Sequence, residues 1–268
     1  MTMHPPANSL QGKVALITGA ASGLGEAAAR LFAACGAKVG ALDCNAPELK
    51  RVVDAITAAG GSALALSADV RAPEPLASAV AEIERHWGRL DLVFANAGIN
   101  GVWAPVDEIT PEEWDTTLDI NLRGAFLTVR ACVPLLKRSG GGSIILTASV
   151  SGTRTFGYSG ATAYAASKAG LVAFGRMTAL ELARHKIRVN TICPGAFESN
   201  IRDHAEMRHL RDLHLPVLLP EGSVPLTGGP APMPDRITPL VWFLASDLSD
   251  HITGTEVYID GAQSLLTG

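Results

Sequence analysis

Short apolar runs alternate with longer segments of helical periodicity along most of the chain. The first run, Lys13–Ile17, is almost entirely apolar, as expected for a strand that is buried on both faces. The segment after the next turn, Gly23–Cys35, has the period of an amphipathic helix. The apolar face of that helix would carry Leu24, Ala27, Ala28 and Leu31.

The same pair of elements repeats towards the C-terminal end. Further strands are predicted at Lys38–Leu42, Ser62–Leu66, Leu90–Ala95, Ser143–Ala148, Ile187–Cys193 and Glu256–Ile259. Further helices are predicted at Pro47–Ala59, Glu74–Trp87, Glu112–Arg138, Ala163–Arg184 and Arg236–Ser246. This alternation predicts an α/β fold with a doubly wound parallel sheet of about seven strands and helices on both faces.

One long segment, Gly195–Asp235, interrupts the alternation. It is rich in Pro and Gly, and loops of this length in a compact domain are usually functional. Its first part, Glu198–Leu213, has an apolar side and a basic side and is predicted to form a helix, whose apolar side suits core packing as well as ligand contact. No linker divides the chain, so residues 1–268 are interpreted as a single domain with a substrate lid at about 195–235.

Composition narrows the range of partners. The formal net charge is -4 and no stretch gathers Lys and Arg, so a nucleic-acid partner is not expected. The N-terminal residues do not resemble a signal peptide, and no apolar run is long enough to span a bilayer, which predicts a cytoplasmic protein without a membrane partner. Four cysteines without paired spacing are interpreted as buried small hydrophobes, not as disulfides or metal ligands: Cys35, Cys44, Cys132 and Cys193.

The first predicted strand leads into a glycine-rich turn, Thr18–Gly25. Glycines permit positive φ and let the backbone approach a pyrophosphate, and the helix N-terminus offers N–H groups and the positive end of its dipole. Because this turn lies between a strand and a helix, it predicts a nucleotide site in a Rossmann-type domain and not an ordinary tight turn. The residues assigned to this site are Gly19, Ser22, Gly23, Leu24 and Gly25.

Asp43 ends the second predicted strand, 18 residues after Gly25. A carboxylate at this position accepts hydrogen bonds from the ribose hydroxyls and repels a 2′-phosphate. Neither the glycine turn nor the residues that follow Asp43, Cys44 and Asn45, supply a cation for such a phosphate. The sequence therefore favours NAD over NADP as the cofactor, and the alternative is that Asp43 is simply a solvated loop residue.

Tyr164 and Lys168 are four residues apart at the start of a predicted helix, and so lie on one face. A tyrosine hydroxyl with the ordinary pKa of about 10 is a poor base at neutral pH. A cation about 4 Å away lowers that pKa by up to about 3 units, which suits proton exchange with an alcohol or carbonyl oxygen. A surface pair is the usual alternative, so the assignment depends on the neighbouring residues.

Ser149 ends the fifth predicted strand, 15 residues before Tyr164. This is the carboxyl edge, where open α/β sheets carry their sites. A hydroxyl at this edge can steady the substrate oxygen while Tyr164 moves the proton. Ser151 is equally able to donate and is the alternative, although we favour Ser149.

Taken together, the motifs resemble those of the short-chain dehydrogenase/reductase family. In chain order they are the glycine turn, Asp69-Val70, Asn96-Ala97-Gly98, Asn121, Ser149, Tyr164 with Lys168, and Pro194-Gly195. The resemblance runs from about Lys13 to Gly261. It implies an NAD-dependent alcohol dehydrogenase or ketone reductase that transfers a hydride between the cofactor and a secondary alcohol or carbonyl.

The resemblance also implies roles in cofactor binding. Asp69 and the Val70 backbone would hold the adenine, and Asn96, Ala97 and Gly98 would line the adenine-ribose side. Near the nicotinamide would lie Tyr164, Lys168, Pro194, Gly195, the Ile192 backbone and the Ser199 hydroxyl.

For catalysis, the resemblance implies a proton relay that runs from Tyr164 through Lys168. Asn121 would help to hold the water that continues this relay to solvent, and Lys168 would also bind the nicotinamide ribose. The interval of 15 residues from Ser149 to Tyr164 is longer than is usual in the family, which reshapes the pocket wall around Thr153–Thr162.

The substrate itself is not determined by the sequence. Pocket walls are expected from Asn100–Trp103, from Val150–Tyr158 and from the lid, and Trp103 and Phe156 are the favoured substrate contacts beside Ser149 and Tyr164. The resemblance also implies a homotetramer built on the two longest predicted helices and the C-terminal segment, although these helices would cover the sheet equally well in a monomer.

Three alternative functions remain. Epimerases and dehydratases of the extended type usually have a longer chain, and enoyl reductases space the Tyr and Lys more widely than Tyr164 and Lys168. A non-enzymatic NAD(H) sensor or scaffold typically lacks a catalytic residue, whereas Asn121, Ser149, Tyr164 and Lys168 are all present.

Overall fold

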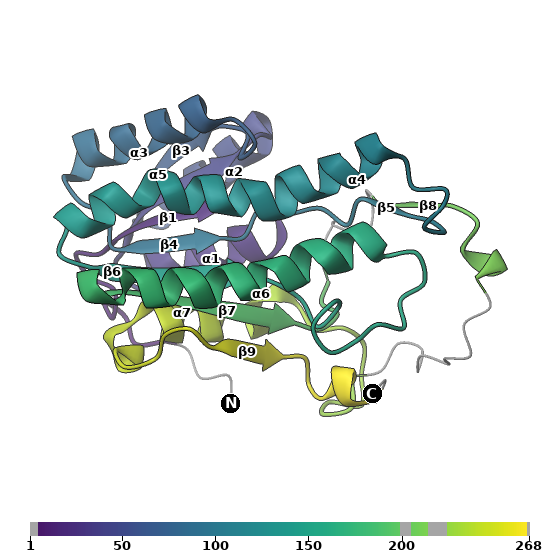
Figure 1. Cartoon of the computed structure of the whole chain (residues 1–268). Helices are drawn as coiled ribbons and strands as arrows, with labels where there is room; N and C mark the ends of the chain where they lie inside the picture. The colour runs from purple at the N-terminus through teal and green to yellow at the C-terminus, as the bar shows by residue number, and fades with distance from the viewer. Residues whose placement is uncertain (1–4, 199–204, 214–223, 267–268) are drawn as a thin grey trace.

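Seven parallel strands form the central sheet of the computed structural model, which describes residues 5–198, 205–213 and 224–266. In sheet order the strands are β3 (Ser62–Ser67), β2 (Lys38–Asp43), β1 (Val14–Thr18), β4 (Leu92–Ala95), β6 (Gly142–Thr147), β7 (Ile187–Pro194) and β9 (Glu256–Ile259). Each neighbouring pair is parallel. The structure thus confirms the predicted parallel sheet (Figure 1).

Helices cover both faces of the sheet, as the alternation of elements predicts (Figure 1). One face carries α3 (Pro73–Trp87), α5 (Gly124–Arg138) and α6 (Thr162–Leu182), and the other carries α1 (Gly23–Ala34), α2 (Ala46–Ala58) and α7 (Thr238–Ala245). A cluster of buried apolar side chains fills the space between the sheet and each helix layer. Burial on both faces explains why inner strands such as β1 and β4 appear in the sequence as nearly unbroken apolar runs.

The chain reverses its winding direction between β1 and β4. β2 and β3 lie on one side of β1, whereas β4, β6, β7 and β9 follow on the other. At such a reversal the loops after the two central strands turn to opposite faces, and a crevice forms at the carboxyl ends of the strands. The glycine turn after β1 and Asn96 after β4 therefore meet at one edge of the sheet, with Asn96 Nδ2 donating to Thr18 O at 3.2 Å.

The helix predicted over Glu112–Arg138 is divided into three segments. α4 covers Pro111–Leu118, a π-helical turn covers Asp119–Arg123, and α5 begins at Gly124. The i→i+5 turn widens the helix, and such turns frequently occur at functional sites. Here the π turn carries the fully buried Asn121.

The helix predicted over Glu198–Leu213 is wrong where the structure describes this segment. Glu206–Met207 form β8, which pairs in parallel with β5 (Val102–Trp103), and Leu210–Asp212 form a 3₁₀ turn. Pairing with a distant segment satisfies backbone groups that a helix would satisfy internally, so the tertiary contact overrides the helical periodicity. Residues 199–204 of the predicted helix lie outside the described residues.

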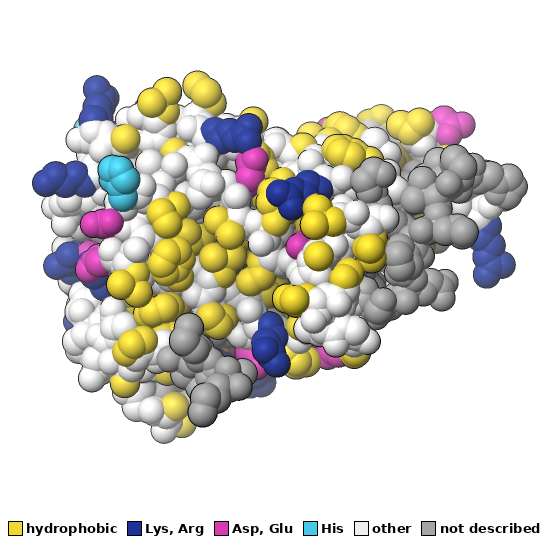
Figure 2. Space-filling model, turned by 90° about the horizontal axis from the view of Figure 1, so that it is seen from below, with side chains coloured by type: hydrophobic (Ala, Val, Ile, Leu, Met, Phe, Trp, Pro, Cys, Tyr) yellow, Lys and Arg dark blue, Asp and Glu magenta, His cyan; other side chains and the backbone are white. Residues whose placement is uncertain are grey.

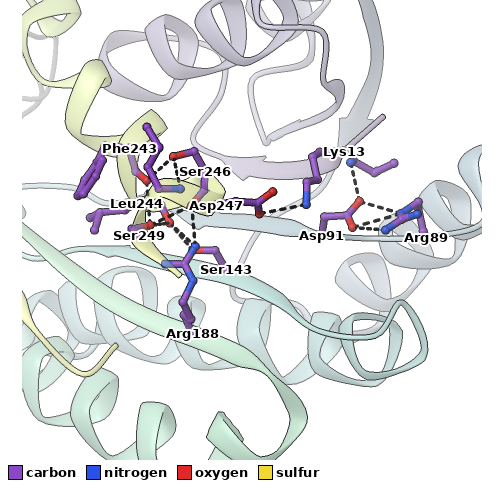
Figure 3. Close-up of polar contacts among 12 residues, drawn as sticks. Lys13, Arg89, Asp91, Ser143, Arg188, Phe243, Leu244, Ser246, Asp247 and Ser249 are labelled. Carbon is purple, nitrogen blue, oxygen red and sulfur yellow. Dashed lines mark hydrogen bonds and ion pairs between the residues drawn. The ribbon is translucent and has the colours of Figure 1, made fainter. Parts of the chain in front are cut away.

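Hydrogen bonds and ion pairs link strands and helices at the amino-terminal edge of the sheet, opposite the crevice (Figure 3). Asp91 accepts a hydrogen bond from Val14 N at 2.9 Å, and its closest contact with the Arg89 guanidinium is 2.6 Å. Arg188 of β7 donates to Leu244 O at 2.9 Å, near the C-terminus of α7, where the helix dipole favours a cation. The cations of this edge are therefore used to hold strands and helices together.

The structure also bears on the predictions for the cysteines and for membrane spans. Cys35, Cys132 and Cys193 are buried as predicted, but Cys44 is exposed because it follows β2 at the rim of the crevice. Among the residues that the structure describes, no helix is both long enough and apolar enough to cross a membrane.

Candidate active site

A cavity of about 700 Å³ opens at the carboxyl ends of the central strands. The predicted site residues that line it are Gly19, Ser22, Gly23, Leu24, Asp43, Asp69, Val70, Asn96, Ala97, Gly98, Trp103, Ser149, Tyr164, Lys168, Pro194 and Gly195. Gly25, Asn121, Ile192 and Phe156 lie outside its lining, and Ser199 belongs to the part of the chain that is not described. The fold thus brings most of the predicted residues together from positions far apart in the sequence.

The glycine turn is packed too closely for side chains. Gly19 has φ +67°, and a Cβ added there would lie 3.0 Å from Ala97 Cα. A Cβ on Gly25 would lie 2.0 Å from Gly19 O, which explains why Gly25 supports the turn from below and does not line the cavity. The turn therefore exposes backbone to the cavity at the N-terminus of α1, which fits the pyrophosphate of a dinucleotide.

Two carboxylates lie along the nucleotide side of the cavity. Asp43 accepts hydrogen bonds from Ala21 N at 3.1 Å and Asn45 N at 2.9 Å, so its side chain is fixed beside the glycine turn. Asp69 forms an ion pair with Arg71 at 2.6 Å, and this hydrogen-bonded pair lowers the pKa of Asp69. Both carboxylates are thus fixed by hydrogen bonds where a ribose and an adenine would lie.

Asn96 joins three strand ends. Its backbone N–H donates to Thr18 Oγ1 at 3.0 Å, and its side-chain oxygen accepts from Thr147 Oγ1 at 3.2 Å. These bonds connect the ends of β1, β4 and β6. Asn96 therefore positions the two loops that form the floor of the cavity.

Lys168 lies beneath Tyr164 at the start of α6. Only 3% of Lys168 is exposed, its Nζ donates to Thr147 O at 2.8 Å, and the same atom is 5.6 Å from the centroid of the Tyr164 ring. Burial lowers the pKa of Lys168 to about 8, because removal from water disfavours the charged form. The predicted phenol and amine are therefore neighbours within one cavity.

Ser149 and Ser151 both reach the cavity, but they have different contacts. The Ser149 hydroxyl oxygen accepts the backbone N–H of Ser151 at 3.1 Å, which orients Ser149. Ser151 is part of a local β-bridge with Thr155. The Ser149 oxygen is thus oriented while its hydroxyl proton can donate elsewhere, and the bridge engages the backbone of Ser151, so both hydroxyls remain candidate donors to a substrate oxygen.

The long interval between Ser149 and Tyr164 forms a loop that is anchored on three sides. Thr153 Oγ1 donates to Ser149 O at 2.6 Å, and a Cβ on Gly152 would lie 2.2 Å from Ala165 O of α6. The Arg154 guanidinium lies 3.4 Å from the centroid of the Tyr258 ring on β9. The extra residues therefore brace the pocket wall against β9 and α6.

The side chain of Asn121 forms hydrogen bonds with Ile99 and Ser167. Its Oδ1 accepts from Ile99 N at 2.8 Å, and its Nδ2 donates to Ile99 O at 2.9 Å and to Ser167 Oγ at 3.0 Å. A Cβ on Gly98 would lie 3.1 Å from Asn121 Oδ1 and 3.3 Å from Lys168 Nζ, so Asn121 and Lys168 face the same small space. The side chain of Asn121 thus fixes the loop beside Lys168.

The walls after β7 are held by the C-terminal segment. Gly195 N donates to Ile259 O at 3.2 Å, and Ala196 N donates to the side-chain oxygen of Gln263 at 2.8 Å. Ile192 is fully buried, and its carbonyl accepts Ala148 N at 2.9 Å within the sheet. Its carbonyl is therefore already used between strands, and among the described residues predicted here Pro194 and Gly195 reach the cavity, whereas Ile192 does not.

The substrate wall contains one of the two predicted aromatic residues. Trp103 lines the cavity, donates through Nε1 to Asn100 O at 3.2 Å, and packs against Tyr158 with ring centroids 6.1 Å apart. Phe156 is 73% exposed and does not line the cavity. The turn between Thr155 and Tyr158 directs the Tyr158 ring to the cavity in place of Phe156.

Comparison with known proteins agrees with this geometry. A family model described as enoyl-(acyl carrier protein) reductase matches residues 19–262. The structure is similar to that of a short-chain type dehydrogenase/reductase from Mycobacterium marinum, with 34% identity, a TM-score of 0.85, and coverage of 96% of this chain and 97% of that one. The chain belongs to the short-chain dehydrogenase/reductase family.

Two further relatives carry more specific names. A crystal structure of a 3-ketoacyl-ACP reductase from Sinorhizobium meliloti 1021 shares 50% identity and a TM-score of 0.90, covering 94% of this chain and 99% of that one. A cyclohexanol dehydrogenase from Acinetobacter sp. (strain SE19) is 35% identical over 255 residues, which are 95% of this chain and 96% of the relative.

In this short-chain dehydrogenase/reductase, the structure also brings charged residues to the cavity that sequence reasoning missed. Arg51 of α2 lines it together with Glu26 and Glu48, and Arg71 lines it after β3. The omission of Arg51 followed from considering only residues adjacent to Asp43 in the chain. The spacing of Glu48 and Arg51 on one face of the helix that begins after Asp43 could have indicated them.

Proposed function

We propose that the chain is an NAD(H)-dependent oxidoreductase that interconverts an uncharged secondary alcohol and its ketone. The observation that carries this proposal is the buried Lys168 beside Tyr164, in the same cavity as the glycine turn and Asp43. The family membership supports an oxidoreductase, and the site supports the finer assignment.

In the proposed mechanism Tyr164 is the acid or base. Ser149 donates a hydrogen bond to the substrate oxygen, and Tyr164 gives that oxygen a proton in reduction or removes it in oxidation. The NAD(H) cofactor, when bound, accepts or supplies the hydride. Lys168 stabilises the phenolate electrostatically and binds the nicotinamide ribose. Asn121 positions the loop beside Lys168, and this loop would hold the water that continues the proton relay.

The preference for NAD rests on Asp43. Its carboxylate is fixed by Ala21 N and Asn45 N at the place where the ribose hydroxyls would lie. A 2′-phosphate there would meet a negative charge at short range, whereas hydroxyls can donate to it. Asp69 and the Val70 backbone would then hold the adenine, as expected for the family.

An uncharged substrate is favoured by the lining of the catalytic half of the cavity. Among the described residues, Lys168 is the sole charged side chain there, and the remaining wall is formed by groups such as Trp103, Val150, Tyr158 and Phe197. Lys168 donates to Thr147 O and is assigned to the nicotinamide ribose, so a substrate carboxylate or phosphate would lose water without gaining another described cation, which is costly. The cyclohexanol dehydrogenase among the relatives is consistent with an alicyclic or other uncharged substrate.

Three other functions are compatible with the family. The similarity to a 3-ketoacyl-ACP reductase suggests reduction of a thioester-bound ketone. The name of the matching family model suggests enoyl reduction, but the four-residue spacing of Tyr164 and Lys168 favours carbonyl chemistry. A non-enzymatic NAD(H) sensor would bind the cofactor without turnover.

We also propose that the chain forms a homotetramer, as the family resemblance implies. On α5 and α6, Phe126, Met177 and Leu180 are 45%, 69% and 78% exposed. The edge strand β9 pairs with β7 alone among the described strands, and apolar side chains gather on the face seen from that side (Figure 2). Light scattering after gel filtration tests this assembly, and a monomer at micromolar concentration would contradict it.

The experiment that tests the function follows nicotinamide absorbance with NAD(H) and NADP(H) against matched substrate classes. We expect turnover of uncharged cyclic and linear secondary alcohols and ketones with NAD(H), and little with NADP(H). Faster turnover of ketoacyl thioesters would favour the first alternative, and double-bond reduction of enoyl thioesters the second. Tight NADH binding without any turnover would favour the sensor.

A further inference from the structure

The nucleotide side of the cavity contains a cation whose charge is already compensated. Arg51 of α2 lines the cavity, and its Nη2 lies 3.5 Å from Ala21 O in the glycine turn. Ala21 N in turn donates to Asp43, so a single residue separates the Arg51 guanidinium from the carboxylate that would bind the ribose. Arg51 is therefore close to the position that a 2′-phosphate would occupy.

Two carboxylates hold Arg51 in place. Its Nη2 is 2.7 Å from Glu26 Oε2 on α1, and its Nε is 2.7 Å from Glu48 Oε2 on its own helix. Glu26 also accepts from Arg30 at 2.8 Å. Burial alone would raise the pKa of Glu26, but the bonds from Arg51 and Arg30 outweigh it and leave that pKa below the ordinary value, so this carboxylate stays charged.

The charge balance of this corner is unfavourable for an anion. Asp43, Glu26 and Glu48 supply three negative charges, and Arg51 and Arg30 supply two positive ones. The other cation on the nucleotide side, Arg71, is bound by Asp69. Three of the five Arg51 N–H groups already donate to Glu26 and Glu48, so a 2′-phosphate that bound Arg51 would compete with these two carboxylates for the guanidinium.

We propose that Arg51 is a latent ligand for the cofactor 2′-phosphate, and that Glu26 and Glu48 restrain it so that the site selects NAD. This inference rests on the proposed NAD preference and extends its structural basis from Asp43 to Glu26 and Glu48 as well. Asp43 repels the phosphate directly, while Glu26 and Glu48 act as positioning residues by keeping the nearby cation occupied. An Arg fork binds phosphate in two parallel hydrogen bonds, which makes a released Arg51 an effective ligand.

The competing explanation is that the ion pairs only join α1 to α2. Arg51 and Glu48 have half-exposed side chains, and exposed ion pairs contribute little to stability. In that case substitutions at Arg51 and Glu48 would change stability slightly and would not distinguish cofactors that differ by a phosphate.

The test measures binding of 2′,5′-ADP and 5′-ADP by calorimetry, which requires no turnover. The parent variant is Asp43→Asn, which removes the direct repulsion. A double variant adds Glu48→Gln to this parent, and a triple variant adds Arg51→Gln to the double variant. Lys50→Gln is the matched control, because Lys50 is adjacent, is paired with Asp54 at 2.6 Å and does not line the cavity. All variants are compared at low and high salt, since a charge contact weakens as salt rises.

We expect Glu48→Gln to tighten 2′,5′-ADP binding of the parent by about threefold to tenfold and Arg51→Gln to abolish that gain, with 5′-ADP little changed. Lys50→Gln should not reproduce the loss. The proposal is overturned if Arg51→Gln changes 2′,5′-ADP binding no more than Lys50→Gln does. If Arg51→Gln weakens binding but Glu48→Gln gives no gain, the restraint by Glu48 is overturned while Arg51 remains the ligand.

NADH and NADPH affinities, measured by the same calorimetry, separate this inference from the proposed function. Wild-type protein that binds NADPH as tightly as NADH would contradict the NAD preference. The effect of Arg51→Gln on wild-type NADPH affinity would still decide whether Arg51 contacts the phosphate. Wild-type protein that prefers NADH, with no effect of Arg51 in any background, would leave the proposed function intact and remove this inference.

Discussion

The nucleotide half and the catalytic half of the cavity are built in different ways. On the nucleotide half, charged side chains are held in pairs, such as Asp69 with Arg71 and Arg51 with Glu26. On the catalytic half, Lys168 is the single charged group among the described lining residues, and it donates to a backbone carbonyl. One half is suited to a polar ligand of fixed shape, and the other to an uncharged reacting group.

This difference indicates that the two halves perform separable tasks. The nucleotide half depends on backbone that lies within one turn, because Gly19 and Gly25 leave no space for side chains. The catalytic half depends on the segments that follow β4, β6 and β7, which meet only in the folded protein. Substitutions in the catalytic half should therefore change turnover or KM while NADH binding remains, and the following predictions test that separation.

The largest effect is expected for Tyr164→Phe. Loss of the phenolic proton should lower kcat by about a hundredfold to ten-thousandfold, because general acid–base catalysis contributes that much. NADH affinity, measured by fluorescence, should stay within about twofold, since the ring is retained. Tyr158→Phe is the matched control, because it removes the other tyrosine hydroxyl of the same cavity. Unchanged turnover in Tyr164→Phe would remove Tyr164 as the acid or base.

The second comparison is between Ser149→Ala and Ser151→Ala. The Ser149 hydroxyl is oriented by the Ser151 N–H, and the backbone of Ser151 survives its own substitution. We expect kcat to fall by about a hundredfold to a thousandfold for Ser149→Ala, as for other donors to a developing oxyanion, and by less than about tenfold for Ser151→Ala. The reverse order in steady-state kinetics would assign the donor to Ser151.

A smaller effect is expected from the aromatic wall. Trp103→Ala removes a ring that lines the cavity and packs on Tyr158, and should raise KM for a ring-bearing substrate about tenfold, equivalent to about 1.4 kcal/mol. Phe156→Ala is the matched control, because Phe156 is exposed and outside the cavity. Equal KM changes in the two variants would show that the wall has been assigned incorrectly.

The smallest effect concerns the pH dependence of stability without cofactor. Burial lowers the pKa of Lys168 to about 8, whereas in the unfolded chain the amine keeps the ordinary lysine pKa of 10.5. Between these values the unfolded state binds the extra proton, so the wild type should gain stability as pH rises, and should be most penalised below pH 8. Relative to Lys168→Met, we expect the wild-type Tm to rise by several degrees across that window.

Parallel pH profiles for the wild type and Lys168→Met would contradict the buried, easily deprotonated amine. No further control variant is needed, because the other titrating groups are common to both proteins and their effects cancel in the Tm difference. If the Tm of Lys168→Met exceeds that of the wild type by an amount that shrinks as pH rises, the result agrees with loss of the desolvation penalty on deprotonation.

Much of the fold and the nucleotide half follow from sequence pattern. Unbroken apolar runs predict strands buried on both faces, and the glycine turn predicts a close backbone approach, because both are consequences of local geometry. The pairing of Tyr164 with Lys168 follows from helix periodicity for the same reason. These features depend on residues close together in the chain, so the sequence alone is sufficient to locate them.

The tertiary structure decided the features that depend on which faces meet. It paired β5 with β8 where a lid helix was predicted, directed Tyr158 and not Phe156 to the cavity, and joined Asn121 to Ile99. It also brought Arg51 to within 3.5 Å of the glycine turn, 30 residues away in sequence. The physical reason is that hydrogen bonds and ion pairs between distant segments form only after the sheet has set the distance between them.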